Sequence, residues 1–142
     1  MPRIIMSPLE MEIIVKLVVS MALGAAIGLE REFNRSAAGL KTYSIVCMGS
    51  AFFTAVAASV NVAVAAGVIT GIGFLGAATI FKTDSKVVGI TTAALIWAVA
   101  AIGFGVGIGM YYASAVATGL LLFILIPVEH FEKKLLKKHD AG

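Results

Sequence analysis

The stretch TYSIVCMGSAFFTAVAASVNVAVAAGVITGIGFLGAATIF, residues 42–81, contains no Asp, Glu, Lys or Arg. A second stretch without these residues occupies positions 87–128. One membrane-spanning helix needs about 20 apolar residues, and each stretch is roughly twice that length. A charged side chain at the bilayer centre costs about 2.5–3.5 kcal/mol on insertion scales, so such gaps are informative. Each stretch therefore predicts a tight pair of spanning helices.

The composition agrees with this interpretation. Of the 142 residues, 60% are hydrophobic and only 13% are charged, and the mean hydropathy is +1.01. A soluble domain carries about a quarter charged residues. These values exclude an ordinary soluble enzyme, a disordered segment and a nucleic-acid-binding module. The single cysteine, Cys47, excludes an internal disulfide framework and a Cys-rich metal site.

Polar breaks divide the apolar stretches into spans. Ser59-Val60-Asn61 interrupts the first stretch and Gly109 to Tyr112 the second, while Ser7-Pro8-Leu9-Glu10 is a capping-box sequence that marks an earlier helix start. We therefore predict an all-α integral membrane protein, a compact five-helix bundle formed by a single domain, residues 1–142. The predicted spans are 9–29, 42–60, 62–81, 89–109 and 111–128, followed by a basic amphipathic tail helix at 129–142.

The distribution of basic residues predicts the orientation of the bundle. Nine of the eleven fall in the loops after the first and third spans and in the tail, and only Arg3 and Lys16 fall on the opposite side. The positive-inside rule then places the amino terminus outside and the carboxyl terminus in the cytoplasm. The apolar stretch begins late, behind Glu10 and Glu12, so no cleaved signal peptide is expected. We expect a multi-pass protein of the prokaryotic cytoplasmic membrane.

Small residues recur at a spacing of four along the predicted helices. The pairs are Gly24/Gly28, Gly67/Gly71, Gly103/Gly107 and Gly105/Gly109. Small residues let helix backbones approach closely in lipid, so we expect tight packing inside the bundle. A surplus of such faces also favours a homo-oligomer, with a dimer preferred.

The third predicted span contains the string Gly71-Ile72-Gly73-Phe74-Leu75-Gly76. A dinucleotide-binding interpretation of its glycines fails, because no strand precedes them and no soluble βαβ unit surrounds them. Glycines weaken a helix, so we expect a broken or tightly packed helix here. Trp97, in the middle of the fourth span, is expected to pack inside the bundle.

Candidate functional residues gather at the predicted cytoplasmic face. Glu30 directly follows an apolar helix and needs a cation, which Arg31, Arg35, Lys41 or a bound metal could supply. The carboxylates of Glu30, Glu32 and Asp84 could together hold Mg²⁺ through water. We favour the alternative, salt bridges that fix helix ends, because basic residues outnumber acidic ones there. Thr91 and Thr92 begin the fourth span, where hydroxyls and free N–H groups can cap the helix or bind an anion.

The sequence does not support catalysis. The predicted spans carry no Asp, Glu, Arg or His beyond their ends, and the Ser, Thr and Cys residues lack a partnering base. His130 and His139 both lie in the tail and do not suggest a zinc site. We expect no enzymatic activity. Since proton relays and ion pathways usually need ionisable groups at mid-bilayer depth, this pattern also weakens the case for a self-contained transporter.

Four co-ordered strings resemble the MgtC/SapB membrane family, and the chain is similar to the transmembrane module of that family alone. They are Gly28-Leu29-Glu30-Arg31-Glu32, Ala38-Gly39-Leu40-Lys41-Thr42, Gly71-Ile72-Gly73-Phe74-Leu75-Gly76-Ala77 and Gly89-Ile90-Thr91-Thr92-Ala93-Ala94, followed by Trp97 and Ala100-Ala101-Ile102-Gly103. The functional residues that the resemblance implies are Glu30, Arg31, Glu32, Arg35, Gly39, Lys41, Thr42, Gly71, Gly73, Phe74, Gly76, Gly89, Thr91, Thr92 and Trp97. The chain departs from the family at Ala63 and Gly67, where relatives commonly carry Arg and Gln.

The resemblance implies a five-span inner-membrane protein with a cytoplasmic carboxyl terminus, linked to adaptation to low Mg²⁺. It also implies a modulator of another membrane protein, such as ATP synthase or a transport ATPase, rather than a carrier of Mg²⁺. The alternative is an ion transporter or channel for Mg²⁺, with its site at the cytoplasmic ends of spans one, three and four. We expect the lipid bilayer as a partner and no nucleic acid.

Overall fold

The fold consists of five helices and one short β-hairpin. The computed structural model describes residues 6–139, without the side chains of residues 59, 60, 62, 64, 65 and 128–139. The elements in chain order are α1 (Pro8–Phe33), α2 (Leu40–Val60), α3 (Val62–Ala77), β1 (Phe81–Lys82), β2 (Val87–Val88), α4 (Ile90–Gly107) and α5 (Tyr111–His139). The predicted all-helical architecture with five helices is confirmed, and the hairpin between α3 and α4 is an addition to it.

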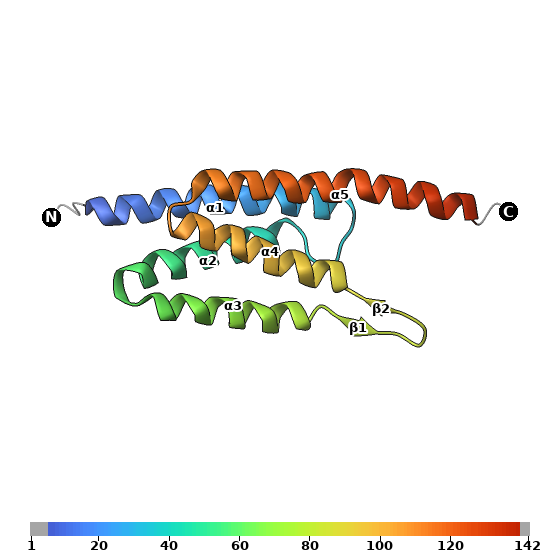
Figure 1. The fold of residues 1–142 in the computed structure, drawn as a ribbon, viewed down its shortest axis with the longest axis horizontal. Helices are drawn as coiled ribbons and strands as arrows, with labels where there is room; N and C mark the ends of the chain where they lie inside the picture. The colour runs from blue at the N-terminus through green and yellow to red at the C-terminus, as the bar shows by residue number, and fades with distance from the viewer. Residues whose placement is uncertain (1–5, 140–142) are drawn as a thin grey trace.

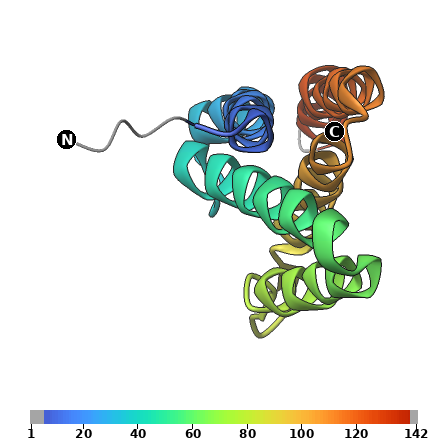
Figure 2. The ribbon, with the colours of Figure 1, turned by 90° about the vertical axis from the view of Figure 1, so that its left-hand side faces the viewer.

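The helices run back and forth along the long axis of the molecule, and the two termini lie at opposite ends (Figure 1). Helices α2 and α4 occupy the middle. Helices α1 and α5 cover one side of this central pair and α3 covers the other (Figure 2). The hairpin projects from the end of the bundle where α2 and α4 begin (Figure 1).

Local sequence explains where the helices begin and end. At the start of α1, the Ser7 N–H donates to the Glu10 carboxylate at 2.6 Å and the Glu10 N–H donates to Ser7 Oγ at 3.2 Å, which confirms the capping box. Asn61 separates α2 from α3, because its N–H donates to Ala57 O and its side chain accepts from the Ala63 N–H. Between α4 and α5, Gly109 adopts a positive φ of 89° that suits glycine.

Within the part of the chain that the structure describes, three helical segments are long and apolar enough to cross a membrane: Pro8–Phe33, Leu40–Ala58 and Ile90–Gly107. Ala66–Ala77 and Tyr111–Pro127 are shorter apolar helical segments. The predicted third span, 62–81, is too long, since α3 ends at Ala77 and the chain turns into β1. The residues after the end of α3 instead form a hairpin, in which Phe81 pairs with Val88 and Lys82 with Val87, and three of these four residues are β-branched or aromatic.

The tail was predicted to continue the fifth span, and the backbone of α5 does run without interruption to His139. Pro127 lies inside this helix. The amphipathic face predicted for the tail lies outside the described side chains.

Close backbone packing holds α1, α2 and α4 together, as the glycine spacing predicted. A Cβ on Gly24 would lie 2.5 Å from the Tyr43 carbonyl oxygen, and one on Gly28 would lie 2.7 Å from Leu40 Cα. Gly107 meets α2 in the same way, with Thr54 Cβ at 2.6 Å from the position of an added Cβ. The buried core lies at this contact and includes Ile27, Tyr43, Cys47, Val99 and Ile102.

Two packing predictions need correction. Helix α3 is continuous, so the glycine string does not break it. Of the string's glycines, Gly76 approaches α4, whereas a Cβ at Gly71 or Gly73, or at Gly67 before them, would have no atom within 4 Å. Trp97 does not pack inside the bundle, since it is 53% exposed. The face of α4 turned toward α2 is occupied instead by small residues, among them Gly103 and Gly107, which leaves the tryptophan outside.

Candidate functional site

Many of the predicted motif residues lie where the end of α1, the loop that follows it, and the starts of α2 and α4 come together (Figure 1). We call this region the junction and define it by residues 30–43 and 89–92. Its buried side chains include Arg31, Tyr43 and Thr92. The Ser36 and Thr92 hydroxyls lie 3.4 Å apart and connect the α1–α2 loop to α4. The junction therefore brings residues far apart in the sequence to one end of the bundle.

Glu30 and Arg31 form a bidentate ion pair in the last turns of α1. Arg31 Nε lies 2.5 Å from Glu30 Oε2, and Arg31 Nη2 donates to Glu30 Oε1 at 2.6 Å. The side chains are only 9% and 10% exposed. The Asn34 amide also donates to Glu30 Oε1, at 2.6 Å. The cation that pairs with Glu30 is therefore Arg31, and the Asn34 contact ties this pair to the end of α1. This arrangement agrees with the favoured alternative, a salt bridge at a helix end.

Glu32 supplies the cap for a different helix. Its Oε2 accepts a hydrogen bond from the Leu40 N–H at 3.0 Å, at the start of α2. The N-cap residue itself, Gly39, has no side chain to do this. A Cβ on Gly39 would collide with the Glu32 carboxylate, so glycine leaves the space that the carboxylate occupies at the start of α2. A carboxylate at a helix N-terminus is also favoured by the helix dipole.

The start of α4 is formed differently from the prediction. Neither Thr91 nor Thr92 caps the helix, because the N-cap is Gly89 and no side chain bonds to the free N–H groups there. Gly89 has a φ of 90°, and a Cβ on it would collide with the Thr79 carbonyl. Thr92 is buried toward Ser36, while Thr91 is exposed. Gly89 thus lets the hairpin return tightly against the end of α3.

The structure does not assemble the three-carboxylate metal site. Among the described residues, no group of three or more His, Cys, Asp or Glu side chains is placed to hold a metal ion. Glu30 is paired with Arg31, Glu32 caps α2, and Asp84 is exposed in the hairpin. The proposed set of Glu30, Glu32 and Asp84 is therefore corrected to three separate carboxylates, two of which stabilise helix ends.

Several predicted motif residues lie away from the junction or on its surface. Gly71, Gly73 and Phe74 belong to α3, where Phe74 is 77% exposed, and Trp97 lies farther along α4. Gly76 approaches α4, since a Cβ on it would lie 3.3 Å from Ala93 O. Arg35, with a positive φ of 53°, and Lys41 and Thr42, at the start of α2, are exposed. The predicted motif residues that make structural contacts in the junction are therefore Glu30, Arg31, Glu32, Gly39, Gly89 and Thr92.

Sequence reasoning missed a set of buried hydroxyl groups between the helices. Ser50 Oγ donates to Ala100 O at 2.7 Å, joining α2 to α4, and Ser114 Oγ donates to Ile102 O at 3.2 Å, joining α5 to α4. Tyr43 OH is buried without a hydrogen-bond partner among the described residues. A signal for Ser50 was its spacing of seven residues from Tyr43, which places both on one face of α2.

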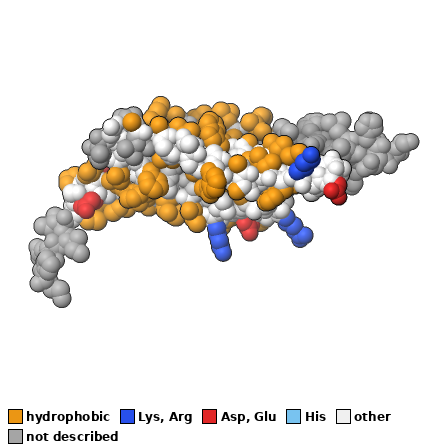
Figure 3. Space-filling model, turned by 90° about the horizontal axis from the view of Figure 1, so that it is seen from below, with side chains coloured by type: hydrophobic (Ala, Val, Ile, Leu, Met, Phe, Trp, Pro, Cys, Tyr) orange, Lys and Arg blue, Asp and Glu red, His pale blue; other side chains and the backbone are white. Residues whose placement is uncertain are grey.

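Charged side chains are few on the face of the molecule that carries α3. Seen from that side, hydrophobic side chains cover most of the described surface, and the Lys and Arg side chains gather in the half away from the amino terminus (Figure 3). The described cavities are also apolar. The largest, of about 560 Å³, lies between α2 and α3 and is lined by aliphatic residues, glycines, Phe53 and Ser50.

Comparison with known proteins finds relatives that are 36–41% identical to the chain. The chain is 36% identical over 141 residues to the "Putative magnesium transporter YhiD" of Escherichia coli (strain K12), covering 90% of this chain and 66% of the relative. It is 41% identical over 107 residues to "Protein MgtC" of Brucella abortus (strain 2308), covering 72% and 45% respectively. For "Protein SapB" of Bacillus subtilis (strain 168), the identity is 37% over 134 residues, covering 83% and 56%.

The chain thus spans between about half and two thirds of the length of these relatives. No solved structure matches it. The model of the MgtC family matches residues 17–134, a range that includes the junction, the helices α2, α3 and α4 in full, and most of α1 and α5. By this match over most of its length, the chain belongs to the MgtC family.

Proposed function

We propose that this chain is a non-enzymatic, multi-pass protein of the bacterial inner membrane that serves adaptation to low Mg²⁺ by modulating another membrane protein. The observation that carries the proposal is the way the ionisable groups of the described helices are used. Glu30 and Arg31 satisfy one another, Glu32 caps α2, and Lys16 pairs with Glu12 near the start of α1. The acidic groups of the junction, Glu30 and Glu32, thus serve to hold helix ends.

The interior of the bundle supports the same proposal. Among the described residues, the buried polar groups of the central helices α2 and α4 are hydroxyls, such as those of Ser50, Thr54 and Thr92. Cavities between the described helices, including the one between α2 and α3 and two that border α4, are lined almost entirely by apolar side chains and glycine. Ion pathways usually carry ionisable or convergent polar groups at bilayer depth. A packed bundle of this kind suits a protein that acts by contact.

A second candidate function is Mg²⁺ transport. The observation that favours it is the printed name of the Escherichia coli relative, a putative magnesium transporter, which shares 36% identity over 90% of this chain. The transporter would place Glu30, Glu32 and Thr92 near the entrance, at the ends of α1 and α4. Our proposal treats the same residues as structural.

Flux measurements on purified protein separate the two functions. The full chain is reconstituted in liposomes loaded with a Mg²⁺-sensitive dye, and Mg²⁺ is added outside. We expect no uptake above that of empty liposomes, while affinity purification from membranes recovers a second membrane protein with the chain. Uptake that depends on the protein and disappears in Glu30→Gln would overturn the modulator and establish the transporter. Gly73→Ala, which alters an open position on α3, is the control for reconstitution.

A further inference from the structure

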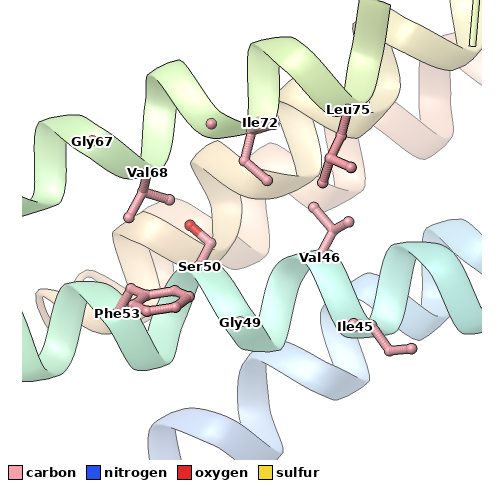
Figure 4. A pocket seen from close by; sticks show the side chains of 10 residues that line it. Ile45, Val46, Gly49, Ser50, Phe53, Gly67, Val68, Ile72 and Leu75 are labelled. Atoms are coloured by element: carbon pink, nitrogen blue, oxygen red, sulfur yellow. The ribbon is translucent and has the colours of Figure 1, made fainter. Parts of the chain in front are cut away.

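An apolar groove lies between α2 and α3. It has a volume of about 560 Å³, and its walls come from both helices, whose side chains face one another across the space (Figure 4). Ile45 and Phe53 on the rim of α2 are 63% and 61% exposed. The groove therefore opens sideways, at the depth of a helix that is long and apolar enough to span a membrane.

Glycines keep the groove open. A Cβ at Gly49, Gly67 or Gly71 would meet no atom within 4 Å, whereas one at Gly24, Gly28 or Gly103 would collide with a neighbouring helix. The first three line the groove and the second three do not. Glycine in a helix interior is unfavourable by about 1 kcal/mol relative to alanine in water, and close helix packing does not explain these three. Their effect is to leave room for an occupant that enters from the bilayer.

Basic side chains stand at one end of the groove. Lys41 lies four residues before Ile45 on α2, which places it one turn along the same helical face as the groove wall. Leu75, the last groove residue of α3, is followed within a few residues by the hairpin with Lys82 and Lys86. These lysines are exposed, form no ion pair with a described carboxylate, and outnumber Asp84 of the same hairpin.

We propose that the groove between α2 and α3 is a binding site for an anionic phospholipid. One acyl chain fills the apolar groove, and the headgroup phosphate meets Lys41 with support from Lys82 and Lys86. Basic residues beside a membrane span attract anionic lipids, and lysine can extend its amine to the headgroup level along its apolar stem. This lipid-binding site does not depend on whether the chain modulates another membrane protein.

A second copy of the chain fits the groove less well. Copies in one membrane share their orientation, and a twofold contact brings the same surface of each copy together. Lys41, Lys82 and Lys86 of the two copies would then approach one another at the same end of the interface, and like charges disfavour that contact. An anionic headgroup at the same place is attracted by all three lysines.

Native mass spectrometry of the full chain tests the proposal. The protein is purified in detergent, incubated with equal amounts of phosphatidylglycerol and phosphatidylcholine, and the retained lipids are counted. We expect one phosphatidylglycerol per chain in preference to phosphatidylcholine. Gly71→Leu, which places a side chain in the groove, loses this lipid. Gly73→Leu, an equally open position on α3 outside the groove, retains it.

Two further variants make the test robust. Gly49→Leu fills the groove from the opposite wall, so it reports the same loss even if Gly71→Leu does not fold. Lys41→Gln lowers the preference for phosphatidylglycerol about fivefold, as expected for one lysine near a membrane surface. Far-UV circular dichroism and size-exclusion chromatography establish that each variant is folded.

Three results would overturn the proposal. The first is that both groove-filling variants retain phosphatidylglycerol as the unaltered protein does. The second is equal retention of the two lipids by the unaltered protein. The third is that Gly71→Leu converts a dimer to a monomer without changing lipid retention, in which case a second copy occupies the groove.

Discussion

The carboxylate of Glu32, in the last turn of α1, accepts a hydrogen bond from the backbone N–H of Leu40 at the start of α2, at 3.0 Å. One helix thus supplies the cap that the next helix lacks, because the N-cap position of α2 is a glycine. This contact joins two helices that are otherwise connected by a short loop, while the neighbouring Glu30–Arg31 pair lies within the last turns of α1. The acidic residues of the family motif are therefore explained by helix geometry.

Removing the Glu32 cap is expected to destabilise the protein. Glu32→Ala should lower the free energy of unfolding by about 1 kcal/mol, the usual cost of losing a helix cap. Glu32→Gln keeps an acceptor oxygen and should lose less. The measurement is unfolding in mixed detergent micelles followed by far-UV circular dichroism. Asp84→Asn, which changes an exposed carboxylate in the hairpin, serves as the control, and equal stability of Glu32→Ala and the unaltered protein would contradict the capping role.

Breaking the Glu30–Arg31 pair is expected to have a larger effect. Each single variant leaves a charge in a site that is about 90% buried, which costs about 3–5 kcal/mol when the partner is removed. The double variant Glu30→Gln with Arg31→Met should therefore lose less than the sum of the two single variants. A double-mutant cycle of unfolding free energies measures this coupling, and strict additivity would mean that the pair does not interact.

The same pair should matter for activity in cells. In a growth assay at low Mg²⁺, Glu30→Ala and Arg31→Ala should each impair complementation more than Lys137→Ala, which changes a residue of the tail. The physical reason is that the first two substitutions disturb the junction that positions three helices. Membrane levels of each variant, measured by immunoblot, separate loss of protein from loss of function. Equal growth of all three variants would argue against a role for the junction.

Glycines at helix contacts and glycines in open positions should respond in opposite ways to alanine. A Cβ on Gly103 would crowd the Cys47 carbonyl and lie 3.0 Å from Ser50 Cβ, so Gly103→Ala should cost about 1–3 kcal/mol through overpacking. Gly73→Ala meets no atom within 4 Å and should be neutral or stabilising. Thermal unfolding of the two variants side by side gives the comparison. A Gly103→Ala protein as stable as Gly73→Ala would refute the close contact between α2 and α4.

The hydrogen bond from Ser50 to Ala100 should make a modest contribution to the contact of α2 with α4. Ser50 is 3% exposed, and hydrogen bonds between helices in membranes contribute about 0.6 kcal/mol on average. Ser50→Ala should lose about that amount in the same unfolding assay. Ser44→Ala, on the same helix, is the matched control, because the Ser44 side chain forms no hydrogen bond with another described residue. If both variants unfold alike, the bond contributes nothing measurable.

The orientation in the membrane can be tested by fusions. A fluorescent protein after Gly142 should fold and fluoresce, because the positive-inside rule places the tail and the hairpin in the cytoplasm. Alkaline phosphatase at the same place should be inactive, and at the α2–α3 turn near Asn61 it should be active. The reverse pattern would invert the proposed topology.

The sequence by itself determined the class of the protein and most of its helix boundaries. Long stretches without charge are typical of apolar helices in a membrane, and local signals such as the Ser7–Glu10 capping box and Asn61 act within a few residues. These effects need no knowledge of distant contacts. Two boundaries were misplaced by four residues, because α1 continues past residue 29 to Phe33 and α3 ends at Ala77 instead of 81. The end of α3 is followed by the pairing of Phe81 with Val88, a contact that an uncharged apolar segment does not reveal.

Only the tertiary structure decided how the motif residues are used. Several basic residues lie near Glu30 in the sequence, and only the geometry of the last turns of α1 shows that its partner is Arg31. Glycines at the same spacing proved to be of two kinds, since Gly24 and Gly28 lie against α2 while Gly67 and Gly71 border an open groove. The spacing along one helix shows which residues share a face. What that face meets depends on where the other helices lie.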